Sequence, residues 1–239
     1  MLTRKLTIKD LEQFSQVSST AYIHNADETT FEEGMEIFGT FADDGITLVS
    51  QIESDFRGLV YCGKRLTCLA VGGVASRPEL RRLGGVRRTF NAVLQNGYEK
   101  GAVVSILHPF SIDYYRKFAY EPVFKYFHIT TPFKTFEKIE RFSGVTLATQ
   151  KDFPALSEVY HSVAKKWNMM FTRDKESAFM LTPYQSMQYL YYINDGEDKG
   201  FVLITPHRPT FTINVNEIVF SNRSALLKLL GFLRTYEGN

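Results

Sequence analysis

The stretch that decides the fold spans residues 74–88 and reads Val74-Ala75-Ser76-Arg77-Pro78-Glu79-Leu80-Arg81-Arg82-Leu83-Gly84-Gly85-Val86-Arg87-Arg88. An apolar run precedes it, two adjacent glycines stand inside it, and an amphipathic helical pattern follows. The first backbone N–H groups of a helix have no partner within the helix, and glycine lets an anion approach them closely. The pattern therefore predicts a strand, a turn and a helix, with an anion site at Gly84 and Gly85.

Five arginines lie in or beside this turn and would supply charge-assisted donors to a pyrophosphate or a ribose phosphate. They are Arg77, Arg81, Arg82, Arg87 and Arg88. The alternative is a basic face in solvent, but the strand–glycine–helix context favours the anion site. No Lys-Ser or Lys-Thr follows the glycines, and no Gly-x-Gly-x-x-Gly occurs. Both absences argue against a P-loop and against a dinucleotide-binding loop.

The composition indicates a protein that can bury hydrophobic cores and that has no strong overall electrostatic field. The chain has 239 residues, of which 44% are hydrophobic, so two compact lobes are expected. The 28 basic and 26 acidic residues give a net charge of +2, which favours neither a nucleic acid nor a membrane as partner. The sequence shows no signal-peptide pattern, so a cytoplasmic protein is expected. Cys62 and Cys68 have no metal-ligand neighbours, so we expect reduced thiols and no metal site.

Hydrophobic periodicity and turn-forming residues predict an alternation of strands and helices. The predicted strands are residues 4–6, 46–52, 56–61, 66–75, 102–107 and 123–130, the last of which would close the first lobe. The predicted helices are residues 10–22, 26–40, 85–100 and 112–118. Gly101 is the expected C-cap of the third helix.

A faint internal repeat appears at an offset of 142 residues. Lys9-Asp10-Leu11, Phe14-Ser15 and Val17 recur as Lys151-Asp152-Phe153, Leu156-Ser157 and Val159. We therefore expect a first lobe over residues 1–132 and a second over residues 133–239, joined by a linker at residues 131–134. The counterpart of the Arg/Gly stretch falls at residues 219–224, which contain no glycine, so the second lobe should bind no phosphate. The same offset places the last strand of that lobe beyond residue 239, so we expect an incomplete lobe of a longer polypeptide.

Three motifs resemble a known family. Arg81-x-x-Gly84 after a strand resembles the acetyl-CoA loop of the GNAT acetyltransferase superfamily. Together with Leu107-His108-Pro109-Phe110-Ser111 and Tyr114-Tyr115-Arg116-Lys117-Phe118-Ala119-Tyr120-Glu121, residues 74–82 resemble the enhanced intracellular survival (Eis) type of N-acetyltransferase. That family has two fused GNAT lobes, the second degenerate, and a sterol-carrier-like lobe. The resemblance implies an α/β GNAT fold, with a mixed central sheet flanked by helices, followed by a degenerate and incomplete second GNAT-like lobe.

The resemblance also implies which residues form the site. Backbone groups of Gly72, Gly73 and Val74 would contact the acetyl group and pantetheine, and Gly72-Gly73 would permit a strand bulge. The pyrophosphate would be held by Arg81, Arg82, Leu83, Gly84, Gly85, Val86 and Arg87. Phe110 and Ser111 would flank the cofactor, and Tyr115 matches the family's proton donor. Val86 and Ala119 depart from the family pattern, which has a small residue and a glycine at these positions.

The implied reaction is transfer of the acetyl group of acetyl-CoA to a primary amine, on a cationic small molecule or a lysine. The acceptor must lose a proton, and in the family a C-terminal carboxylate beyond this chain is thought to receive it. His24, Glu28 and Glu32 are the candidate bases here, and slow or absent turnover is expected. The acidic residues between 26 and 40 favour a cationic acceptor or simply form a solvated face.

Two other functions stay open, and the family's ring assemblies suggest a homo-oligomer. A non-catalytic acetyl-CoA or CoA-binding module would need the loop but neither a donor nor a base. A nucleic-acid-binding module would use the arginines, but the near-neutral net charge argues against it.

Overall fold

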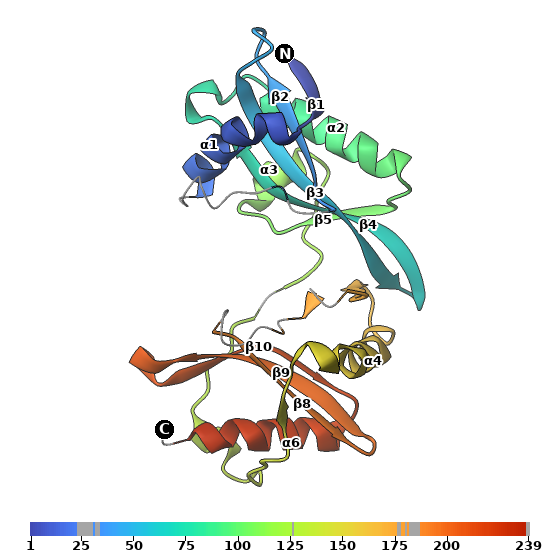
Figure 1. Cartoon of the computed structure of the whole chain (residues 1–239), viewed down its shortest axis with the longest axis vertical. Coiled ribbons are helices and arrows are strands. Elements are labelled where there is room, and N and C mark those ends of the chain that lie inside the picture. The colour runs from blue at the N-terminus through green and yellow to red at the C-terminus, as the bar shows by residue number, and fades with distance from the viewer. Residues whose placement is uncertain are drawn as a thin grey trace. The chain divides into compact units, whose positions relative to one another are not determined.

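The computed structural model describes residues 1–22, 31, 34–125, 127–175, 178–179, 181 and 187–237. The chain forms two compact units. The first comprises Met1–Leu59 and Arg65–Tyr126, and the second comprises Val60–Lys64 and Phe127–Asn239. Figure 1 colours the first unit from blue to green and the second from green to red.

The first unit is built on a mixed sheet. Its strands are β1 (Leu2–Lys5), β2 (Glu36–Phe41), β3 (Leu48–Tyr61), β4 (Lys64–Ser76) and β5 (Val104–Leu107), which lie side by side in this order. The pairs β1–β2 and β2–β3 are antiparallel, and the pair β4–β5 is parallel. Its helices are α1 (Leu11–Tyr22), α2 (Gly85–Glu99) and α3 (Ile112–Arg116). The predicted α/β fold with a mixed sheet flanked by helices is thus confirmed.

The helices cover opposite faces of this sheet because strand side chains alternate. In β2, Ile37 belongs to the core beneath α1, together with Phe14 and Val17 of that helix. The next residue, Phe38, packs against the core beneath α2, which is centred on Phe90. The site described below therefore lies where both helical layers meet the end of β4.

A cluster of buried hydroxyl groups fastens the start of α2 to the sheet. Thr40, Ser50 and Thr89 are fully buried, and the Thr89 hydroxyl lies 2.8 Å from each of the other two hydroxyl oxygens. Thr89 also donates to the Gly85 carbonyl at 3.1 Å. A Cβ at Gly85 would stand 2.8 Å from Val49 Cγ1, so only glycine lets the helix begin this close to β3.

The predicted helix over residues 26–40 is wrong where the structure describes it, because residues 36–41 form β2. The spacing of Phe31, Met35 and Phe38 imitates a helical stripe. However, β2 pairs with strands on both sides, and a Cβ at Gly39 would meet Leu6 and Leu48. Pairing with neighbours distant in sequence outweighs a weak local preference. Residues 23–30 and 32–33 lie outside the described residues.

Two strand predictions also change. The predicted strands 46–52 and 56–61 form one continuous strand, β3. The predicted strand 123–130 is absent from described residues 123–125 and 127–130, where Val123, Phe124, Phe127 and Ile129 are exposed. Alternating apolar residues do not make a strand without a neighbouring strand to pair with. The predicted helix 85–100 is confirmed as α2, and Gly101 follows it with a left-handed φ of 79°.

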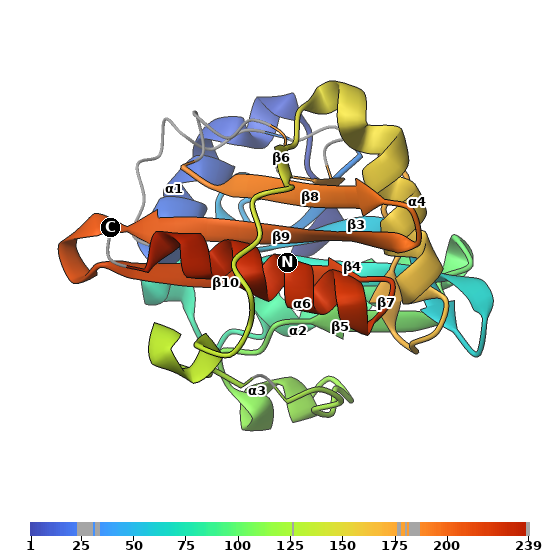
Figure 2. The same cartoon turned by 90° about the horizontal axis from the view of Figure 1, so that it is seen from below.

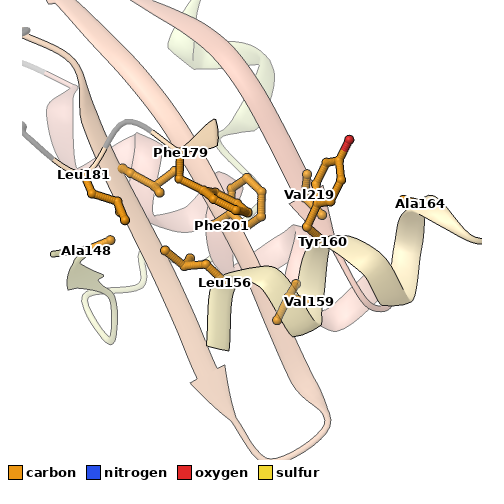
Figure 3. Close-up of a cluster of buried hydrophobic side chains, with 10 residues drawn as sticks. Ala148, Leu156, Val159, Tyr160, Ala164, Phe179, Leu181, Phe201 and Val219 are labelled. Atoms are coloured by element: carbon orange, nitrogen blue, oxygen red, sulfur yellow. The ribbon is translucent and has the colours of Figure 1, made fainter. Parts of the chain in front are cut away.

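The second unit has a four-stranded antiparallel sheet in the order β10-β9-β8-β6. Its strands are β6 (Thr146–Leu147), β8 (Tyr189–Asp195), β9 (Asp198–His207) and β10 (Thr212–Phe220), and the short β7 spans Met170–Phe171. Helix α4 (Phe153–Ala164) packs on one face through Leu156 and Phe201, as Figure 3 shows. Helix α6 (Arg223–Leu233) packs on the other face and lies along β9 and β10 in Figure 2.

The two units share an order of elements. The first begins β1-α1-β2-β3-β4-α2, and the second has β6-α4-β8-β9-β10-α6 with the additional β7 after α4. Helices α1 and α4 both span 12 residues, and their bounds differ by 142 at each end. A capping box precedes each helix, formed by Thr7 with Asp10 and by Thr149 with Asp152. The offset found in the sequence therefore holds for these two helices and their caps.

Candidate functional site

The first unit contains a cavity of about 740 Å³ beside the Arg/Gly turn. It is bounded by the end of α1, the end of β4, the turn before α2, the first turn of α2, and the region of α3. Its lining residues are Ala21, Tyr22, Val49, Val74, Ala75, Ser76, Leu80, Arg81, Arg82, Gly84, Gly85, Val86, Arg87, Phe110, Tyr114, Lys117 and Phe118. Its size suits a cofactor or a small-molecule substrate.

The start of α2 presents open hydrogen-bond donors at this cavity. Gly84 is the N-cap residue, has a left-handed φ of 83°, and provides no side-chain cap. Among the described residues, no group accepts a hydrogen bond from the backbone N–H of Gly85, Val86 or Arg87. The first bonded amide is that of Arg88, which donates to the Gly84 carbonyl at 3.1 Å. Three consecutive open amides at the positive end of a helix could hold an anion.

Three arginines add positive charge to the same cavity. Arg81, Arg82 and Arg87 line it, and their side chains form no ion pair or hydrogen bond with the described part of the chain. The Arg87 guanidinium carbon lies 5.5 Å from the centre of the Phe118 ring. These guanidinium groups thus retain their donors for an anionic ligand.

Arg77 does not serve this site, so the expectation for all five arginines is wrong at this position. Its Nε donates to the Leu48 carbonyl at 2.9 Å, and its second terminal nitrogen donates to Gln16 Oε1 at 3.1 Å. Arg77 therefore ties the end of β4 to β3 and α1.

The end of β4 is separated from β5. The parallel pairing of these strands ends at Val71 with Leu107, whereas β4 continues to Ser76. Leu69 and Val71 belong to the core on the α2 side, but Ala75 belongs to the core on the α1 side. The alternation of side chains between the two faces of the sheet therefore reverses between Val71 and Ala75. Gly73, which lies between them, has a left-handed φ of 53°. The strand irregularity expected at Gly72-Gly73 is present, and it leaves one edge of β4 without β5 beyond Val71.

Tyr22 connects α1 to this edge. Its hydroxyl donates to the Val74 carbonyl at 3.2 Å, and both residues line the cavity. Burial raises the pKa of Tyr22, and the charge of Glu53 raises it further. We did not predict Tyr22 as a site residue, since a tyrosine at the end of an amphipathic helix has no recognisable motif.

Tyr115 lies directly behind the cavity wall. It is buried, and its ring packs against Phe110 and Tyr114 at centroid distances of 5.4 and 5.3 Å. Burial, followed by the nearby Tyr22, raises the pKa of Tyr115 to about 12. Its hydroxyl has no hydrogen-bond partner within the described residues. The phenol is therefore protonated at neutral pH and can act as a donor to a developing anion.

The structure brings most, but not all, predicted residues to the cavity wall. Those that line it are Val74, Arg81, Arg82, Gly84, Gly85, Val86, Arg87 and Phe110; those that do not are Gly72, Gly73, Leu83, Ser111 and Tyr115. Leu83 is exposed, and Ser111 caps α3 by accepting from the Tyr114 amide at 3.3 Å. The cavity is also lined by Tyr114, Lys117 and Phe118, to which we assigned no role from the sequence. These three residues lie on the side of the 114–121 motif that is directed toward α2.

The two departures from the family pattern are accommodated. Val86 lines the cavity within the first turn of α2. Ala119 adopts a left-handed φ of 65°, and the turn after α3 is still closed by Ala119 N–H to Arg116 and Tyr120 N–H to Tyr115. A non-glycine residue in this conformation costs roughly 1 kcal/mol.

The predicted bases His24, Glu28 and Glu32 all lie outside the described residues. Within the residues that the structure describes, no group of three or more His, Cys, Asp or Glu side chains could hold a metal ion. No helix in the same part of the chain has both the length and the hydropathy to cross a membrane. Cys62 lies exposed in the turn after β3, and burial raises the pKa of the Cys68 thiol to about 11.

Comparison with known proteins agrees with this geometry. Residues 3–123 match the family model described as an acetyltransferase (GNAT) domain. No curated protein sequence matches the chain significantly.

Solved structures with the same fold include three acyltransferase-like proteins. A probable N-acyltransferase from Enterococcus faecalis has a TM-score of 0.82 at 20% identity, covering 100% of this chain and 62% of its own. A GCN5-related N-acetyltransferase from Anabaena variabilis has a TM-score of 0.76 at 15% identity, with coverages of 100% and 63%. Eis1 from Mycobacterium abscessus has a TM-score of 0.69 at 19% identity, with coverages of 98% and 63%. The chain thus spans less than two thirds of each of these proteins.

Proposed function

The chain belongs to the family of GNAT acetyltransferase domains, and from this premise we propose that its first unit binds acetyl-CoA and transfers the acetyl group to a primary amine. The observation that carries the proposal is one cavity with two kinds of open donor. The amides of Gly85, Val86 and Arg87 and the side chains of Arg81, Arg82 and Arg87 have no hydrogen-bond or ion-pair partners in the described structure. A diphosphate would satisfy both sets at once.

The rest of the cavity provides for the remainder of the cofactor. The unpaired edge of β4 beyond Val71 offers backbone groups to the amides of pantetheine. The thioester would then lie at the β4 end of the cavity, near Val74, while the phosphates lie at the α2 end. The aromatic side chains of Phe110 and Tyr114 supply apolar surface beside it.

The transfer needs no nucleophile from the protein. The lone pair of a neutral amine attacks the thioester carbonyl carbon, the C–S bond breaks, and the departing thiolate accepts a proton. The nitrogen, positively charged after attack, loses one proton to give the neutral amide. Tyr115 is the proposed source of that proton, since its pKa of about 12 keeps the phenol protonated at neutral pH. A free amide N–H at the end of β4 would stabilise the oxyanion that forms on the carbonyl oxygen.

The motifs around Arg81, Phe110 and Tyr115 further support an Eis-type enzyme acting on a cationic small molecule or a lysine side chain. The likeness to Eis1 of Mycobacterium abscessus, at 19% identity, supports the fold of such an enzyme. We propose that the chain acts in the cytoplasm and carries a second, degenerate GNAT-like unit.

Binding and transfer can be measured separately. Acetyl-CoA at a hundredfold excess over its dissociation constant should stabilise the chain by about 2.7 kcal/mol in thermal unfolding. Release of the CoA thiol should be followed with Nα-acetyl-lysine amide, spermidine and an aminoglycoside as acceptors. Tyr115→Phe should lower turnover at least about a hundredfold while leaving acetyl-CoA affinity within about twofold. Tyr98→Phe, at an exposed position of α2, is the matched control.

Stabilisation without thiol release for any acceptor would favour the second candidate, a non-catalytic acetyl-CoA-binding module. The open amides and arginines fit that function equally well. The absence of any stabilisation by acetyl-CoA would contradict both functions.

A further inference from the structure

One carboxylate lies beside β4 next to Val74, a residue that lines the cavity. Glu53 is a partly buried residue of β3, and its carboxyl group lies against the Cα of Gly73 on β4. A Cβ at Gly73 would overlap both the Cδ and the Oε1 of Glu53. The left-handed glycine therefore makes the space that this carboxyl group occupies.

Two phenols share this location. The Tyr22 hydroxyl of α1 donates to the carbonyl of Val74, one residue after Gly73. The charge of Glu53 raises the pKa of Tyr22. Burial raises the pKa of Tyr115 of α3, and the nearby Tyr22 raises it further. Glu53 of β3 and Tyr22 of α1 meet at the strand irregularity of β4, and Tyr115 belongs to the core that contains Val71 and packs against Val74. Tyr22 and Val74 line the same cavity as the arginines and the first turn of α2.

Two other carboxylates of the first unit lie away from Gly73. Asp10 binds Arg4 through both oxygens, at 2.7 and 2.8 Å. Glu36 binds Lys5 of β1 at 2.5 Å and Lys100, which follows α2, at 2.7 Å. Among the described residues of this unit, Glu53 is the carboxylate placed beside the proposed position of the thioester.

We propose that Glu53 is the catalytic base that receives the proton of the acceptor amine, an inference that rests on the transfer reaction proposed above. In this step an N–H bond of the bound ammonium breaks and an O–H bond to the Glu53 carboxylate forms. The freed lone pair of nitrogen then forms the C–N bond, the C–S bond breaks, and the thiolate takes the Tyr115 proton. The nitrogen loses its second proton to the Tyr115 oxygen, which leaves a neutral amide and a neutral phenol. The negative charge of Glu53 also selects a cationic acceptor.

The pH dependence of the rate tests this role. A base on the enzyme lets the protonated amine react, so kcat/KM for Nα-acetyl-lysine amide should be nearly flat between about pH 6 and 9, well below the amine pKa of ~10.4. In Glu53→Gln only the amine already neutral in solution can react. Its kcat/KM should fall about a hundredfold at neutral pH and rise about tenfold per pH unit. Burial raises the pKa of Tyr22 and of Tyr115, and the charge of Glu53 raises the pKa of Tyr22 further, so both phenols stay neutral across this range.

Matched variants separate this role from a structural one. Glu53→Asp should recover part of the rate with the flat profile. Asp55→Asn, two residues along the same strand and paired with Arg57 at 2.7 Å, should behave like wild type. Acetyl-CoA affinity should stay within about twofold in all three variants, since none removes a phosphate ligand.

The possible results are distinguishable. A flat profile in Glu53→Gln, or a large loss of its acetyl-CoA affinity, would overturn the role of Glu53 and leave the transfer reaction intact. No turnover by the wild-type chain with any acceptor would overturn the transfer reaction and the role of Glu53 together.

Discussion

The two units of this protein make the same strand-to-helix junction in opposite ways. In the first unit β4 leads to α2 through a turn that ends in left-handed Gly84, and the first amides of the helix stay open. In the second unit β10 leads to α6 through Ser221 and Asn222, and the Asn222 side chain accepts from the Ala225 amide at 2.9 Å. The first junction leaves its first amides open, whereas the second caps one of them with its own side chain.

The comparison shows that a few residues decide whether the first amides of the helix stay open or are capped. The order of strands and helices is the same, and both helices pack on a sheet core. The second junction lacks the glycines, and it has only Arg223 where the first has several arginines. Ser221 closes the turn further, because its hydroxyl donates to the Glu197 carbonyl at 2.9 Å and accepts from the Lys199 amide at 3.0 Å. The side chains of Ser221 and Asn222 thus supply hydrogen bonds at the second junction that have no counterpart at the first.

The largest effect is expected from charge reversal at the first junction. Arg82→Glu/Arg87→Glu should weaken acetyl-CoA binding at least about a hundredfold, roughly 2.8 kcal/mol, because two unpaired cations at the cavity become anions. Arg223→Glu at the second junction should change the affinity by less than about twofold. Isothermal titration at two salt concentrations measures both, and equal losses in the two variants would contradict the assignment of the site to the first unit.

The helix caps should differ next. Asp10 and Asp152 occupy equivalent capping boxes, but only Asp10 also binds an arginine, Arg4, which holds the pKa of Asp10 at about 2. Above pH ~4 this lowered pKa contributes about 2 kcal/mol to the free energy of unfolding. The contribution is lost as the pH falls toward 2.

Asp10→Asn should therefore destabilise the first unit by about 2 kcal/mol at neutral pH. Asp152→Asn should cost the second unit less, about 1 kcal/mol. Burial opposes the ionisation of Asp152, and its pKa is lowered by hydrogen bonds from Thr149 and Tyr192 rather than by an arginine. Hydrogen exchange read separately in α1 and α4 checks the order, which equal costs would contradict.

The smallest effect concerns the cap of the second junction. Asn222→Ala removes the side-chain acceptor of the Ala225 amide and should destabilise α6 by about 1 kcal/mol. It should create no acetyl-CoA binding in the second unit, because opening one amide supplies neither the glycines nor the arginines. Hydrogen exchange in α6 and titration of a chain that carries Arg82→Glu/Arg87→Glu as well as Asn222→Ala test both statements.

Local patterns predicted the elements whose signals lie within a few residues. Helix α2 was found because Gly84, Gly85 and Gly101 mark its ends and the apolar spacing between them is regular. The repeat was found because the capping residues and the apolar face recur together. Strand β2 was missed because its partners β1 and β3 are remote in sequence and its apolar residues imitate a helical spacing.

The site divides in the same way. The turn with the open amides could be predicted because its glycines, arginines and helix are contiguous. Tyr22 and Glu53 could not be predicted, because they reach the end of β4 from α1 and β3. Arg77 illustrates the converse, since the sequence cannot show that this arginine is used by Leu48 and Gln16.

The amino-acid sequence by itself determined the strand–turn–helix at residues 74–88, the doubled helix with its caps, and the absence of an equivalent glycine turn near residue 220. Only the tertiary structure decided which donors remain open, how β4 departs from β5 beyond Val71, and which carboxylate lies against Gly73. The physical reason is range. Backbone conformation and capping depend on residues a few positions apart, whereas burial, pairing and the neighbours of a charged group depend on segments that meet only in the folded chain.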